Sequence, residues 1–517
     1  MCLQKMFGIW VFVAIFSSIE GYKVLVVFPI PAGSHRNLGD GYVRNLLKAG
    51  HEVTYITPFP YESSDPNLRL ITTGDTVNAI SGSSLNITAL MLHEVEMDQD
   101  RHFQLAINIT KNTLKNKSVQ KLLNDPSESF DVIVAEWMFN DVYCGFSALF
   151  RCPYIWSFPY ETNSISLGLL GEFSNPAYTA NIETSDVPPF DFWQRVYSLW
   201  FRITSRVQHL FFYENIEKNL YEEIFSPILK KRGITTLPEY DILRYNASLI
   251  LGNTDPSIGQ ALALPENYIP IAGYHIDEVK PLPQDLKDIL DDAKHGVIYF
   301  SLGSNLKSKD FPEKILQDLL KLFGELQQTV IWKFEQSLTN KPANVHILKW
   351  APQQSILAHP NCVLFITHGG MLSVTEAVHF SVPFIGLPVF YDQNFNVAKS
   401  VQRGFALKVS LSLNLAEDLK DAVQEILNNN TYREAMKQTS ITYHNRMIPP
   451  GDELVYWVEY VVRTNGAPHY RSAALLLPWY QKMYLDFIAT VIVCVCLFIY
   501  MIKTLCIKCK VQKIKSS

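Results

Sequence analysis

Residues 23–57 read KVLVVFPIPAGSHRNLGDGYVRNLLKAGHEVTYIT. The run Lys23–Pro29 is continuously apolar after its first residue, which is typical of a strand buried on both faces of a sheet. A loop follows, then a helical stretch to Lys48, and Glu52–Thr57 has the pattern of a second strand. Strand, helix and strand in this order predict a βαβ unit, and therefore a parallel sheet with helices on its faces.

The same unit recurs along the chain. Phe130–Ala135 and Pro153–Phe158 predict two strands around a helix at Asn140–Phe150. A second series begins after the proline-rich stretch Lys280–Pro283. Its predicted strands are Gly296–Ser301, Thr329–Lys333, His346–Lys349, Val363–Thr367 and Pro383–Leu387. The predicted fold class is therefore α/β, with two Rossmann-like domains, residues 22–280 and 281–465, facing a cleft.

Length and composition agree with two domains. The chain has 517 residues, of which 48% are apolar and 18% charged, so it has enough material for buried cores. The formal net charge of −5 is spread along the chain, and no long basic run precedes the extreme C-terminus. This charge pattern argues against a nucleic-acid partner.

The N-terminus has the pattern of a signal peptide. Lys5 precedes a short apolar stretch and two small residues, which predicts a signal peptide at residues 1–21. Only Cys144, Cys152 and Cys362 belong to the predicted lumenal body, so the chain is no disulfide scaffold. Cys144 and Cys152 could pair or could be free buried thiols. Asn-x-Ser/Thr sequons compatible with lumenal exposure occur at Asn86, Asn108, Asn116, Asn246 and Asn429.

The C-terminus has the pattern of a membrane anchor. Residues 484–502 are almost wholly apolar and long enough to span a bilayer. Aromatic residues in the juxtamembrane segment, residues 466–483, precede this span, and a lysine-rich tail, residues 503–517, follows it. This asymmetry predicts a type I membrane protein with its catalytic domains in the lumen and its tail in the cytosol. Lys513 and Lys515 resemble the dilysine signal of endoplasmic reticulum membrane proteins.

Residues 350–393 combine several features suited to a nucleotide. A predicted buried strand runs into His368-Gly369-Gly370 and then into a helix, so free backbone N–H groups and a positive helix end would face an anion. Glu376 lies further along that helix, where a carboxylate could bind ribose hydroxyls, and Trp350 could stack on a planar base. Each feature alone would also fit a buried tryptophan or an ordinary turn between strand and helix.

Together, residues 350–393 resemble the signature of the UDP-glycosyltransferase family, without a gap over the whole stretch. The resemblance extends to Val297–Asn305, Trp332–Glu335, Gly273–Pro283, the loop that carries His35, and the C-terminal span with its basic tail. It therefore covers nearly the whole chain. It implies a GT-B fold, in which the N-terminal half binds the acceptor and the C-terminal half binds the UDP-sugar.

The resemblance also implies which residues bind the UDP-sugar. The residues at the uracil positions are Trp350 and Gln353. The residues at the diphosphate positions are Ser304, His368, Gly369, Gly370 and Ser373. Glu376 falls at the ribose, and Asp392 and Gln393 fall at the hydroxyls of the transferred sugar.

His35 matches the family's general base. It stands at the start of a predicted helix, whose dipole disfavours the imidazolium and keeps the ring able to accept a proton; capping or solvent exposure is the alternative for a lone histidine. The family's partner carboxylate usually is an Asp at the end of the strand Phe130–Ala135. This chain has Glu136 there and Asp141 about one helical turn later. Either could orient His35; Asp141 is slightly preferred because it restores the usual residue type, although Asn140-Asp141 could instead be an N-cap.

Two further stretches admit two interpretations. Aromatic residues over 190–201 recur at helical spacing and predict a core-facing stripe, with contact to a membrane surface or an apolar acceptor as the alternative. Asp98-Gln99-Asp100 has the form of a metal-binding Asp-x-Asp motif but is predicted to be a solvated loop. No metal site and no cofactor are expected, because a helix end and a histidine could neutralise the leaving diphosphate.

The resemblance thus predicts an inverting, metal-independent UDP-glycosyltransferase. It would move a hexose from a UDP-sugar to the hydroxyl of a small lipophilic acceptor, in conjugation or detoxification. Asp392 adds negative charge where a glucuronate carboxylate would sit, and the chain leans to the family's invertebrate glucosyltransferases, so glucose is preferred over glucuronate. The alternatives are a UDP-sugar-binding lumenal protein without turnover and a transferase acting on sterols or lipids in the bilayer. A secreted hydrolase is disfavoured by the C-terminal span and by the absence of a nucleophile elbow, and a homo-oligomer remains open.

Overall fold

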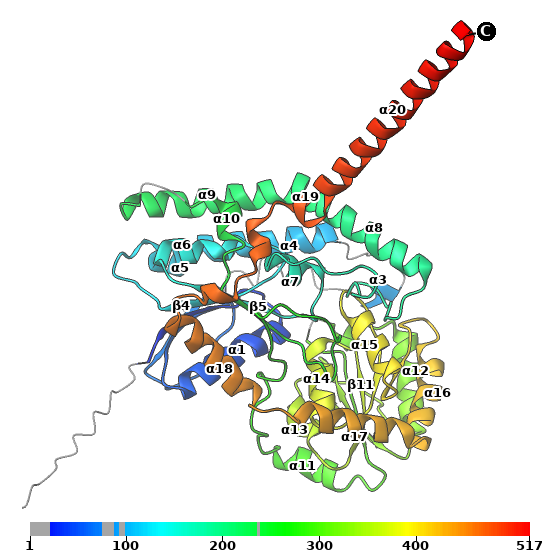
Figure 1. Cartoon of the computed structure of the whole chain (residues 1–517). Coiled ribbons are helices and arrows are strands. Elements are labelled where there is room, and N and C mark those ends of the chain that lie inside the picture. The colour runs from blue at the N-terminus through cyan, green and yellow to red at the C-terminus, as the bar shows by residue number, and fades with distance from the viewer. Residues whose placement is uncertain (1–20, 75–86, 92–98, 235–237, 305, 517) are drawn as a thin grey trace, which may run out of the picture.

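Two parallel β-sheets, each covered by helices, make up the body of the chain (Figure 1). The computed structural model describes residues 21–74, 87–91, 99–234, 238–304 and 306–516. The predicted signal peptide lies outside the described residues except for Gly21. The two sheets confirm the predicted α/β class.

The first sheet has the strand order β3-β2-β1-β4-β5-β6-β7, with all neighbours parallel. The strands are β1 (Lys23–Val27), β2 (Glu52–Thr57), β3 (Leu68–Thr72), β4 (Val132–Glu136), β5 (Tyr154–Phe158), β6 (Leu249–Gly252) and β7 (Tyr268–Pro270). β1 lies between β2 and β4, with Val24 opposite both Val53 and Val132. The apolar run that predicted β1 is thus buried on both faces.

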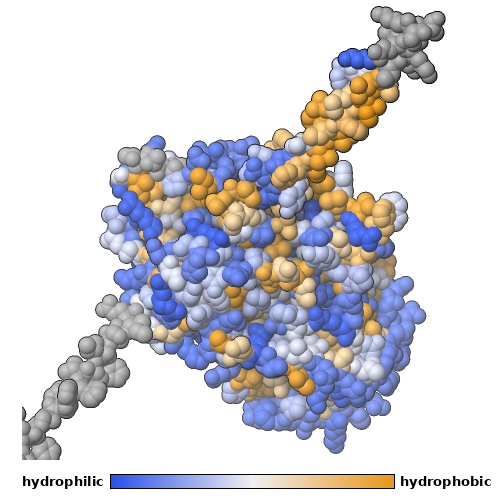
Figure 2. Space-filling model, in the orientation of Figure 1, coloured by the Kyte–Doolittle hydropathy of each residue, from blue (hydrophilic) through white to orange (hydrophobic). Residues whose placement is uncertain are grey.

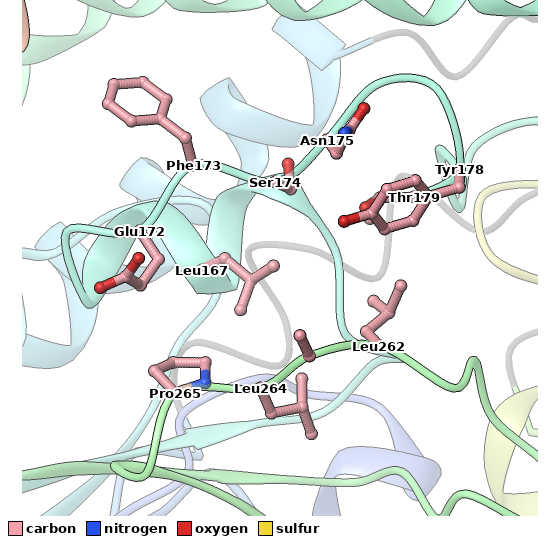
Figure 3. Close-up of a pocket in the computed structure, with 11 residues that line it drawn as sticks. Leu167, Glu172, Phe173, Ser174, Asn175, Tyr178, Thr179, Leu262, Leu264 and Pro265 are labelled. Carbon is pink, nitrogen blue, oxygen red and sulfur yellow. The ribbon is translucent and has the colours of Figure 1, made fainter. Parts of the chain in front are cut away.

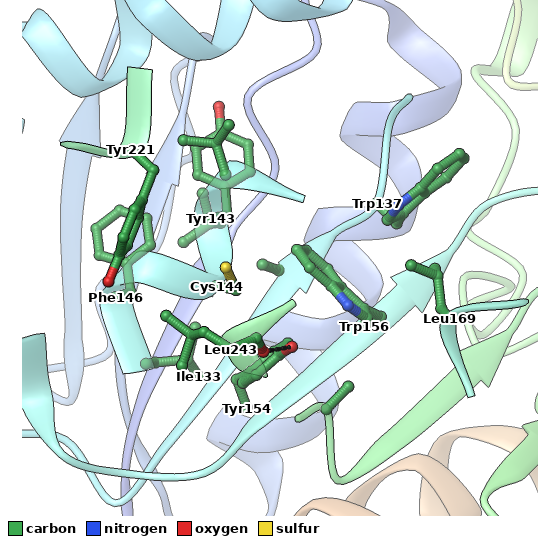
Figure 4. Packing of buried hydrophobic residues seen from close by; sticks show 14 of the residues in the cluster. Ile133, Trp137, Tyr143, Cys144, Phe146, Tyr154, Trp156, Leu169, Tyr221 and Leu243 are labelled. Carbon is green, nitrogen blue, oxygen red and sulfur yellow. Dashed lines mark hydrogen bonds between the residues drawn. The ribbon is translucent and has the colours of Figure 1, made fainter. Parts of the chain in front are cut away.

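Helices of the first half cover both faces of this sheet. They are α1 (Gly33–Lys48), α4 (Gln99–Lys115), α5 (Lys117–Asn124), α6 (Gly145–Phe150), α7 (Ser164–Leu169), α8 (Phe192–Gln208), α9 (Glu214–Lys231) and α10 (Tyr240–Leu243). The short helix α3 (Ile87–Met91) packs on the second half instead, where Ile87 and Met91 lie in one core cluster with Phe311. The 3-10 turn η2 (Val142–Cys144) precedes α6, and the short π-helix η3 (His209–Tyr213) precedes α9. On one face Ile133, Trp156 and Phe146 pack with Tyr221 of α9, and the Tyr154 hydroxyl donates to the Leu243 carbonyl at 2.8 Å (Figure 4).

The second sheet repeats the same winding, in the order β10-β9-β8-β11-β12-β13. Its strands are β8 (Val297–Ser301), β9 (Thr329–Lys333), β10 (Val345–Leu348), β11 (Cys362–Thr367), β12 (Phe384–Gly386) and β13 (Ala406–Lys408). Its helices are α11 (Gln284–Asp291), α12 (Glu313–Gly324), α13 (Gln353–Leu357), α14 (Met371–His379), α15 (Gln393–Gln402), α16 (Leu415–Asn428) and α17 (Thr431–His444), with the short turn η4 (Ser308–Asp310).

Each sheet has one place where the direction of winding reverses. In the first sheet the reversal falls between β1 and β4, and in the second between β8 and β11. The loops that leave the carboxyl ends of such strand pairs diverge and leave a crevice, which is where parallel sheets bind ligands. The fold therefore predicts a ligand site formed by the residues that follow β1, β4, β8 and β11.

The helix α18 (Pro450–Arg463) corrects the predicted domain boundary at residue 465. Its buried residues Leu454, Val458 and Val461 pack in one cluster with Val24 and Tyr42 of the first half. α18 lies beside α1 on the first half (Figure 1). The predicted second domain, residues 281–465, includes α18, but the apolar face of α18 is buried on the side of the first sheet.

The C-terminus leaves the body as one long helix. Short turns η5 (Pro468–Tyr470) and η6 (Ala473–Leu476) and helix α19 (Trp479–Lys482) lead to α20 (Leu485–Ser516). The segment 485–508 is long and apolar enough to cross a membrane, and its most apolar stretch is not buried inside the body. The predicted apolar C-terminal helix is confirmed as a candidate span, and it continues into the predicted tail.

The aromatic stretch 190–201 does not form the predicted core-facing stripe. Phe190 is buried, but Phe192, Trp193, Tyr197 and Trp200 are exposed on α8. The helix that the spacing predicts is confirmed as α8, but spacing alone does not show whether the apolar side of a helix faces the core. Cys144 and Cys152 are free and buried, so the paired alternative is wrong.

Candidate active site

A cavity of about 980 Å³ lies between the two halves at the carboxyl ends of both sheets. Residues from the two reversal points line it together. Of the residues proposed from the sequence, the cavity is lined by His35, Ser304, Trp350, Gln353, His368, Gly370, Ser373, Glu376, Asp392 and Gln393. Glu136 and Asp141 are buried beside the first sheet, and Gly369 packs under the cavity floor against Val397.

His35 and Glu136 form a close pair at the reversal point of the first sheet. His35 is in the first turn of α1, after β1, and Glu136 is the last residue of β4. The Nδ1 atom of His35 lies 2.5 Å from Oε1 of Glu136, and the other carboxylate oxygen has no hydrogen-bond partner among the described residues. Burial raises the pKa of the Glu136 carboxyl, while the charge of His35 acts in the opposite direction. The pair leaves Nε2 as the ring nitrogen that can exchange a proton with a ligand.

Asp141 does not contact His35, so the slight preference for it is wrong. Its carboxylate pairs with Arg244 at 2.9 Å and accepts a hydrogen bond from Trp137 Nε1 at 2.7 Å. After β4 the chain turns at Phe139, whose φ of 54° carries Asp141 away from the cavity. Asp141 precedes η2 without a side-chain capping hydrogen bond, so it is an internal ion-pair residue rather than a cap.

The turn after β8 and the turn after β11 meet around His368. Gly303 has a φ of 76° and Gly369 a φ of 79°, both left-handed conformations that favour glycine. A Cβ atom at Gly303 would lie 2.6 Å from His368 Cε1, and one at Gly370 would lie 2.5 Å from Nε2. Burial, with the charge of Lys333, lowers the pKa of His368 to about 4, so the ring is neutral at pH 7. A neutral imidazole can still donate one N–H to a phosphate oxygen.

Positive charge reaches this part of the cavity from other groups. Gly370 caps α14, so the first N–H groups of that nine-residue helix start at the cavity wall. Lys307 and Lys333 also line the cavity, and Lys333 Nζ lies 2.8 Å from Glu335. The sequence reasoning missed both lysines as site residues, although Lys333 lies in a segment that resembles the family.

Glu376 is held in place by neighbours from two directions. Gln353 Nε2 donates to one carboxylate oxygen at 2.6 Å, and Gln354 Nε2 donates to the other at 3.0 Å. His275 Nε2 lies 3.4 Å from the second oxygen. Burial alone would raise the pKa of Glu376, but the hydrogen bonds and charge of these partners lower it, so the carboxylate stays ionised. The sequence did not predict a role for His275, although His275 lies in Gly273–Pro283, a segment that resembles the family.

Trp350 stands at the rim of the cavity. Its side chain is 70% exposed, and it immediately precedes the turn into α13. An exposed indole at a cavity rim offers a flat apolar face on which a planar ligand can stack. The location is thus compatible with base stacking, whereas a buried structural tryptophan is excluded.

Asp392 and Gln393 lie at the start of α15. Asp392 accepts a hydrogen bond from Asn396 Nδ2 at 2.8 Å, and burial raises the pKa of its carboxyl to about 6. Gln393 uses its Oε1 atom to accept the backbone N–H groups of Val389 and Phe390 at 2.9 and 3.3 Å. Gln393 therefore shapes the loop before it as well as lining the cavity.

The wall of the first half is aromatic and apolar. His102, Phe139, Tyr160 and Tyr391 form a chain of ring contacts, with centroid distances of 4.6 Å between Tyr160 and Tyr391 and 5.3 Å between His102 and Phe139. Tyr391 comes from the second half, so this cluster joins the two halves beside Asp392. The sequence reasoning missed these residues because their contacts depend on the docking of the halves.

The Asp-x-Asp motif is not the predicted solvated loop where the structure describes it. Asp98 lies outside the described residues, while Gln99 and Asp100 begin α4. The Tyr213 hydroxyl donates to Asp100 at 3.2 Å. Among the described residues, no three His, Cys, Asp or Glu side chains are grouped as metal ligands.

A smaller cavity of about 290 Å³ lies elsewhere in the first half (Figure 3). Leu167, Phe173 and Tyr178 line one side of it, and Leu262 and Leu264 line the other. None of the residues proposed from the sequence lies in it.

Comparison with known proteins agrees with this geometry. Residues 23–517 match the family described as "UDP-glucoronosyl and UDP-glucosyl transferase". UDP-glucosyltransferase 2 of Dactylopius coccus is 32% identical over 496 residues, covering 96% of this chain and 94% of that protein. Human UDP-glucuronosyltransferase 2B10 is 27% identical, covering 90% of each chain.

Solved structures show the same architecture. The calicheamicin glycosyltransferase CalG4 superposes with a TM-score of 0.52 at 17% identity, covering 86% of this chain and 99% of that one. A UDP-glucosyltransferase of Polygonum tinctorium gives a TM-score of 0.54 at 14% identity with the same coverage. These similarities show the GT-B fold, and the family match extends over both halves and the C-terminal helix. The chain therefore belongs to the UDP-glycosyltransferase family, and it is a glycosyltransferase enzyme.

Proposed function

We propose that this enzyme transfers a hexose, with glucose preferred, from a UDP-sugar to the hydroxyl of a small lipophilic acceptor, with inversion at the anomeric carbon. The observation that carries the proposal is the His35–Glu136 pair at 2.5 Å, because its His35 lines the same cavity as the glycine turns of the second sheet. A base from one half and an anion-binding junction from the other are what a two-substrate transfer requires.

The proposed reaction begins at Nε2 of His35. This nitrogen takes the proton of the acceptor hydroxyl, and the Glu136 carboxylate stabilises the imidazolium that forms. The acceptor oxygen then attacks the anomeric carbon from the face opposite UDP, and the bond from that carbon to the diphosphate oxygen breaks. Attack from the opposite face inverts the configuration of the sugar.

The departing UDP carries new negative charge on its diphosphate. The N-terminus of α14 and the side chains of Lys307 and Lys333 lie around the turns that hold His368. Preorganised donors of this kind stabilise developing charge without reorganisation. We therefore propose that the reaction needs no metal ion and no cofactor.

The sugar preference rests on Asp392. With a pKa of about 6, its carboxyl is largely ionised at pH 7 and would accept hydrogen bonds from neutral sugar hydroxyls. A glucuronate carboxylate placed there would meet a like charge in a buried site. Glucuronosyl transfer remains the second candidate, because the relatives include both glucosyltransferases and glucuronosyltransferases.

The acceptor class rests on the aromatic wall of the first half. Apolar and aromatic side chains such as Ile109, Met138 and Tyr160 line the cavity near His35. They favour a phenol, a steroid or a similar hydroxyl compound and a role in conjugation or detoxification. A UDP-sugar-binding protein without turnover would have no use for the His35–Glu136 pair.

We also propose an endoplasmic reticulum location, with the catalytic halves in the lumen. The support is the signal-peptide pattern, the apolar helix α20 and the lysines that follow it. Lumenal exposure would also allow glycosylation at the sequons, and in this arrangement α20 is a single span.

The test is glycoside formation by microsomes that carry the chain. They receive a panel of phenols with UDP-glucose or UDP-glucuronate, with and without EDTA, beside microsomes carrying His35→Ala. We expect product from UDP-glucose that resists EDTA and is lost in the variant. Product from UDP-glucuronate alone would overturn the sugar preference, and loss with EDTA would overturn the metal-independent mechanism. Labelled UDP-sugar that binds without any product would favour the binding-protein alternative.

A further inference from the structure

Tyr391 lies in the turn between β12 and α15, in a backbone conformation that a tyrosine rarely adopts. Its φ is 52°, in the left-handed region that favours glycine. It immediately precedes Asp392, the residue proposed to bind the hydroxyls of the transferred sugar. A side chain keeps such a conformation only where its surroundings fix it, and conformations of this kind cluster at functional sites. The contacts of the Tyr391 ring must therefore account for its presence in this turn.

The Tyr391 ring is buried in the first half, although its backbone belongs to the second half. Its centroid lies 4.6 Å from that of Tyr160, 5.1 Å from that of His102 and 5.3 Å from that of Phe139. Tyr391 and Phe395 both belong to the core cluster of the first half. The surface of the second half in Figure 2 is largely hydrophilic, whereas these two side chains are buried against the first half. Aromatic pairs at these separations stabilise the contact between the halves.

The ring contacts join the turn beside the proposed base to the turn beside the sugar residue. Phe139 lies three residues after Glu136, and its φ of 54° is also left-handed. Tyr391 lies directly before Asp392, and its ring contacts the Phe139 ring. Two strained turns, one from each half, therefore support each other through one pair of rings. The position of the sugar residue relative to the base depends on this contact.

The same rings close the cavity beside Asp392 with apolar surface. Tyr160, Phe390 and Tyr391 line the cavity together with His35 and Asp392. Burial, followed by the charge of Asp392, raises the pKa of the Tyr160 hydroxyl, so the sugar residue lies close to the wall of the first half. The Tyr391 hydroxyl is buried and has no hydrogen-bond partner among the described residues, so the ring makes the contacts. An ordered water needs about two to four polar partners, and this wall offers few.

We propose that Tyr391 determines whether an acceptor or a water molecule attacks the sugar. Its ring fills the space beside Asp392, and a flat hydroxyl compound packs on the wall that it shares with Tyr160. Without the ring, water can occupy that space, give a proton to His35 and attack the anomeric carbon. The bond from that carbon to the diphosphate oxygen then breaks, and the products are free hexose and UDP. The inference rests on the proposed transfer and assigns to the same site its discrimination against hydrolysis.

The test measures how UDP-glucose is divided between transfer and hydrolysis. The purified full-length chain in detergent receives labelled UDP-glucose and a saturating phenol, and glycoside and free glucose are quantified in the same sample. Tyr391→Ala removes the ring and keeps a side chain at the left-handed φ, whereas Tyr391→Gly removes the ring and the strain together. We expect both variants to raise the ratio of hydrolysis to transfer by about tenfold or more. Tyr391→Phe keeps the ring and should keep the wild-type ratio.

Two controls separate this role from a structural one. Ser381→Gly relieves a left-handed φ of 59° in the same half, and Ser381 is not among the residues that line the cavity, so the ratio should stay at the wild-type value. UDP affinity by calorimetry shows whether each variant is folded. A variant that is only less stable loses both reactions in proportion, so its ratio does not change. If Tyr391→Ala and Tyr391→Gly both fail to bind UDP, the ratio in Tyr391→Leu, which leaves part of the space empty, decides against that in Tyr391→Phe.

The outcomes distinguish this inference from the proposed function. A wild-type ratio in Tyr391→Ala and Tyr391→Gly would overturn the inference and leave the proposed transfer in place. An equally raised ratio in Tyr391→Phe would assign the effect to the hydroxyl, and one in Ser381→Gly would assign it to backbone strain; in either case the inference is wrong. If the wild type forms no glycoside from any UDP-sugar and phenol, the proposed function fails, and the inference that rests on it fails with it.

Discussion

His35 and Glu136, the proposed catalytic pair, meet because His35 lies in the first turn of α1, after β1, and Glu136 ends the neighbouring strand β4. Glu136 faces His35 with one oxygen, and its other oxygen has no partner among the described residues. A buried carboxylate with so few partners acts on the imidazole through a medium of low effective dielectric constant. Orientation of the ring and stabilisation of its charged form therefore depend on this one contact.

Glu136→Gln should reduce kcat by about 10²–10⁴-fold, because an amide keeps the shape of the side chain but cannot stabilise the imidazolium. Affinity for UDP, whose proposed site is on the side of the cavity formed by the second half, should be unchanged. The measurement is kcat with a saturating phenol, together with UDP affinity by calorimetry. Full activity in Glu136→Gln would remove Glu136 from the mechanism. Glu136→Asp is the matched control, since it keeps the charge but shortens the reach.

Asp392 should make UDP-sugar affinity depend on pH. Burial raises the pKa of its carboxyl to about 6, so the group is ionised above that pH and neutral below it. The ionised form is the better hydrogen-bond acceptor, so affinity for UDP-glucose should fall as pH drops through about 6. For stability the sign is opposite: a raised pKa stabilises the fold at low pH, and this contribution is lost as pH rises through about 6. Calorimetric titration with UDP-glucose from about pH 5 to about pH 8 measures this change in affinity.

The matched variants for that titration are His35→Ala and Asp392→Asn. His35→Ala should keep the fall in affinity, because Asp392 still titrates. Asp392→Asn should bind more weakly at pH 7 and show no fall near pH 6. An unchanged fall in Asp392→Asn would assign the titration to another group.

Among the elements, the four strands beside the two reversals could be predicted from the sequence, whereas the strand order and several shorter strands could not. β1, β4, β8 and β11 are buried runs of apolar residues, and their pattern does not depend on the rest of the fold. β7 and β13 each have three residues, too few for a periodic pattern. Glu136 and Asp141 could not be separated either, because the choice depends on the left-handed φ of Phe139.

The turn after β8 should tolerate no side chain at Gly303. An alanine there combines a left-handed φ with a Cβ atom 2.6 Å from the His368 ring, so the imidazole must move away from the proposed phosphate site. Gly303→Ala should weaken UDP binding by about tenfold or more, the effect of losing a positioned donor. The measurement is UDP affinity by calorimetry on folded protein.

Gly404→Ala is the matched control for this prediction. Gly404 has the same kind of φ, 79°, but a Cβ atom there would meet only Ala435 at 3.9 Å. Both variants carry backbone strain of about 1–2 kcal/mol, and only Gly303→Ala displaces His368. Equal loss of UDP affinity in both would attribute the effect to strain and not to the histidine.

At the scale of the whole molecule, the two halves are joined by more than the connecting chain. α18 returns to the first half after the second sheet is complete. Arg403, which follows the last residue of α15, donates to the Gly259 carbonyl of the first half at 2.8 Å. Lys399, on α15, lies 4.0 Å from Glu161, and burial lowers the pKa of its ammonium to about 8. These contacts hold the two halves against each other. None of these contacts is visible in a local pattern of residues. This is why the sequence did not predict the domain boundary or the aromatic wall, although the residues proposed from single turns line the cavity.

Leu454→Ala should destabilise the fold by about 2–5 kcal/mol, because Leu454 is fully buried between α18 and the first sheet. The exposed neighbour Met447→Ala should change stability by less than about 0.5 kcal/mol. Thermal unfolding of the full chain in detergent, with both variants side by side, gives the comparison. A Leu454→Ala chain as stable as Met447→Ala would mean that α18 is not part of the first half's core.

We propose that His35 removes the acceptor's proton in a UDP-sugar transfer. This role is tested by the rate of glycoside formation per bound UDP-glucose in the wild type and in His35→Ala. The variant should bind UDP-glucose as the wild type does but form glycoside at least about 10²-fold more slowly. If the variant forms glycoside at the wild-type rate, His35 is not the base and another group must take the proton.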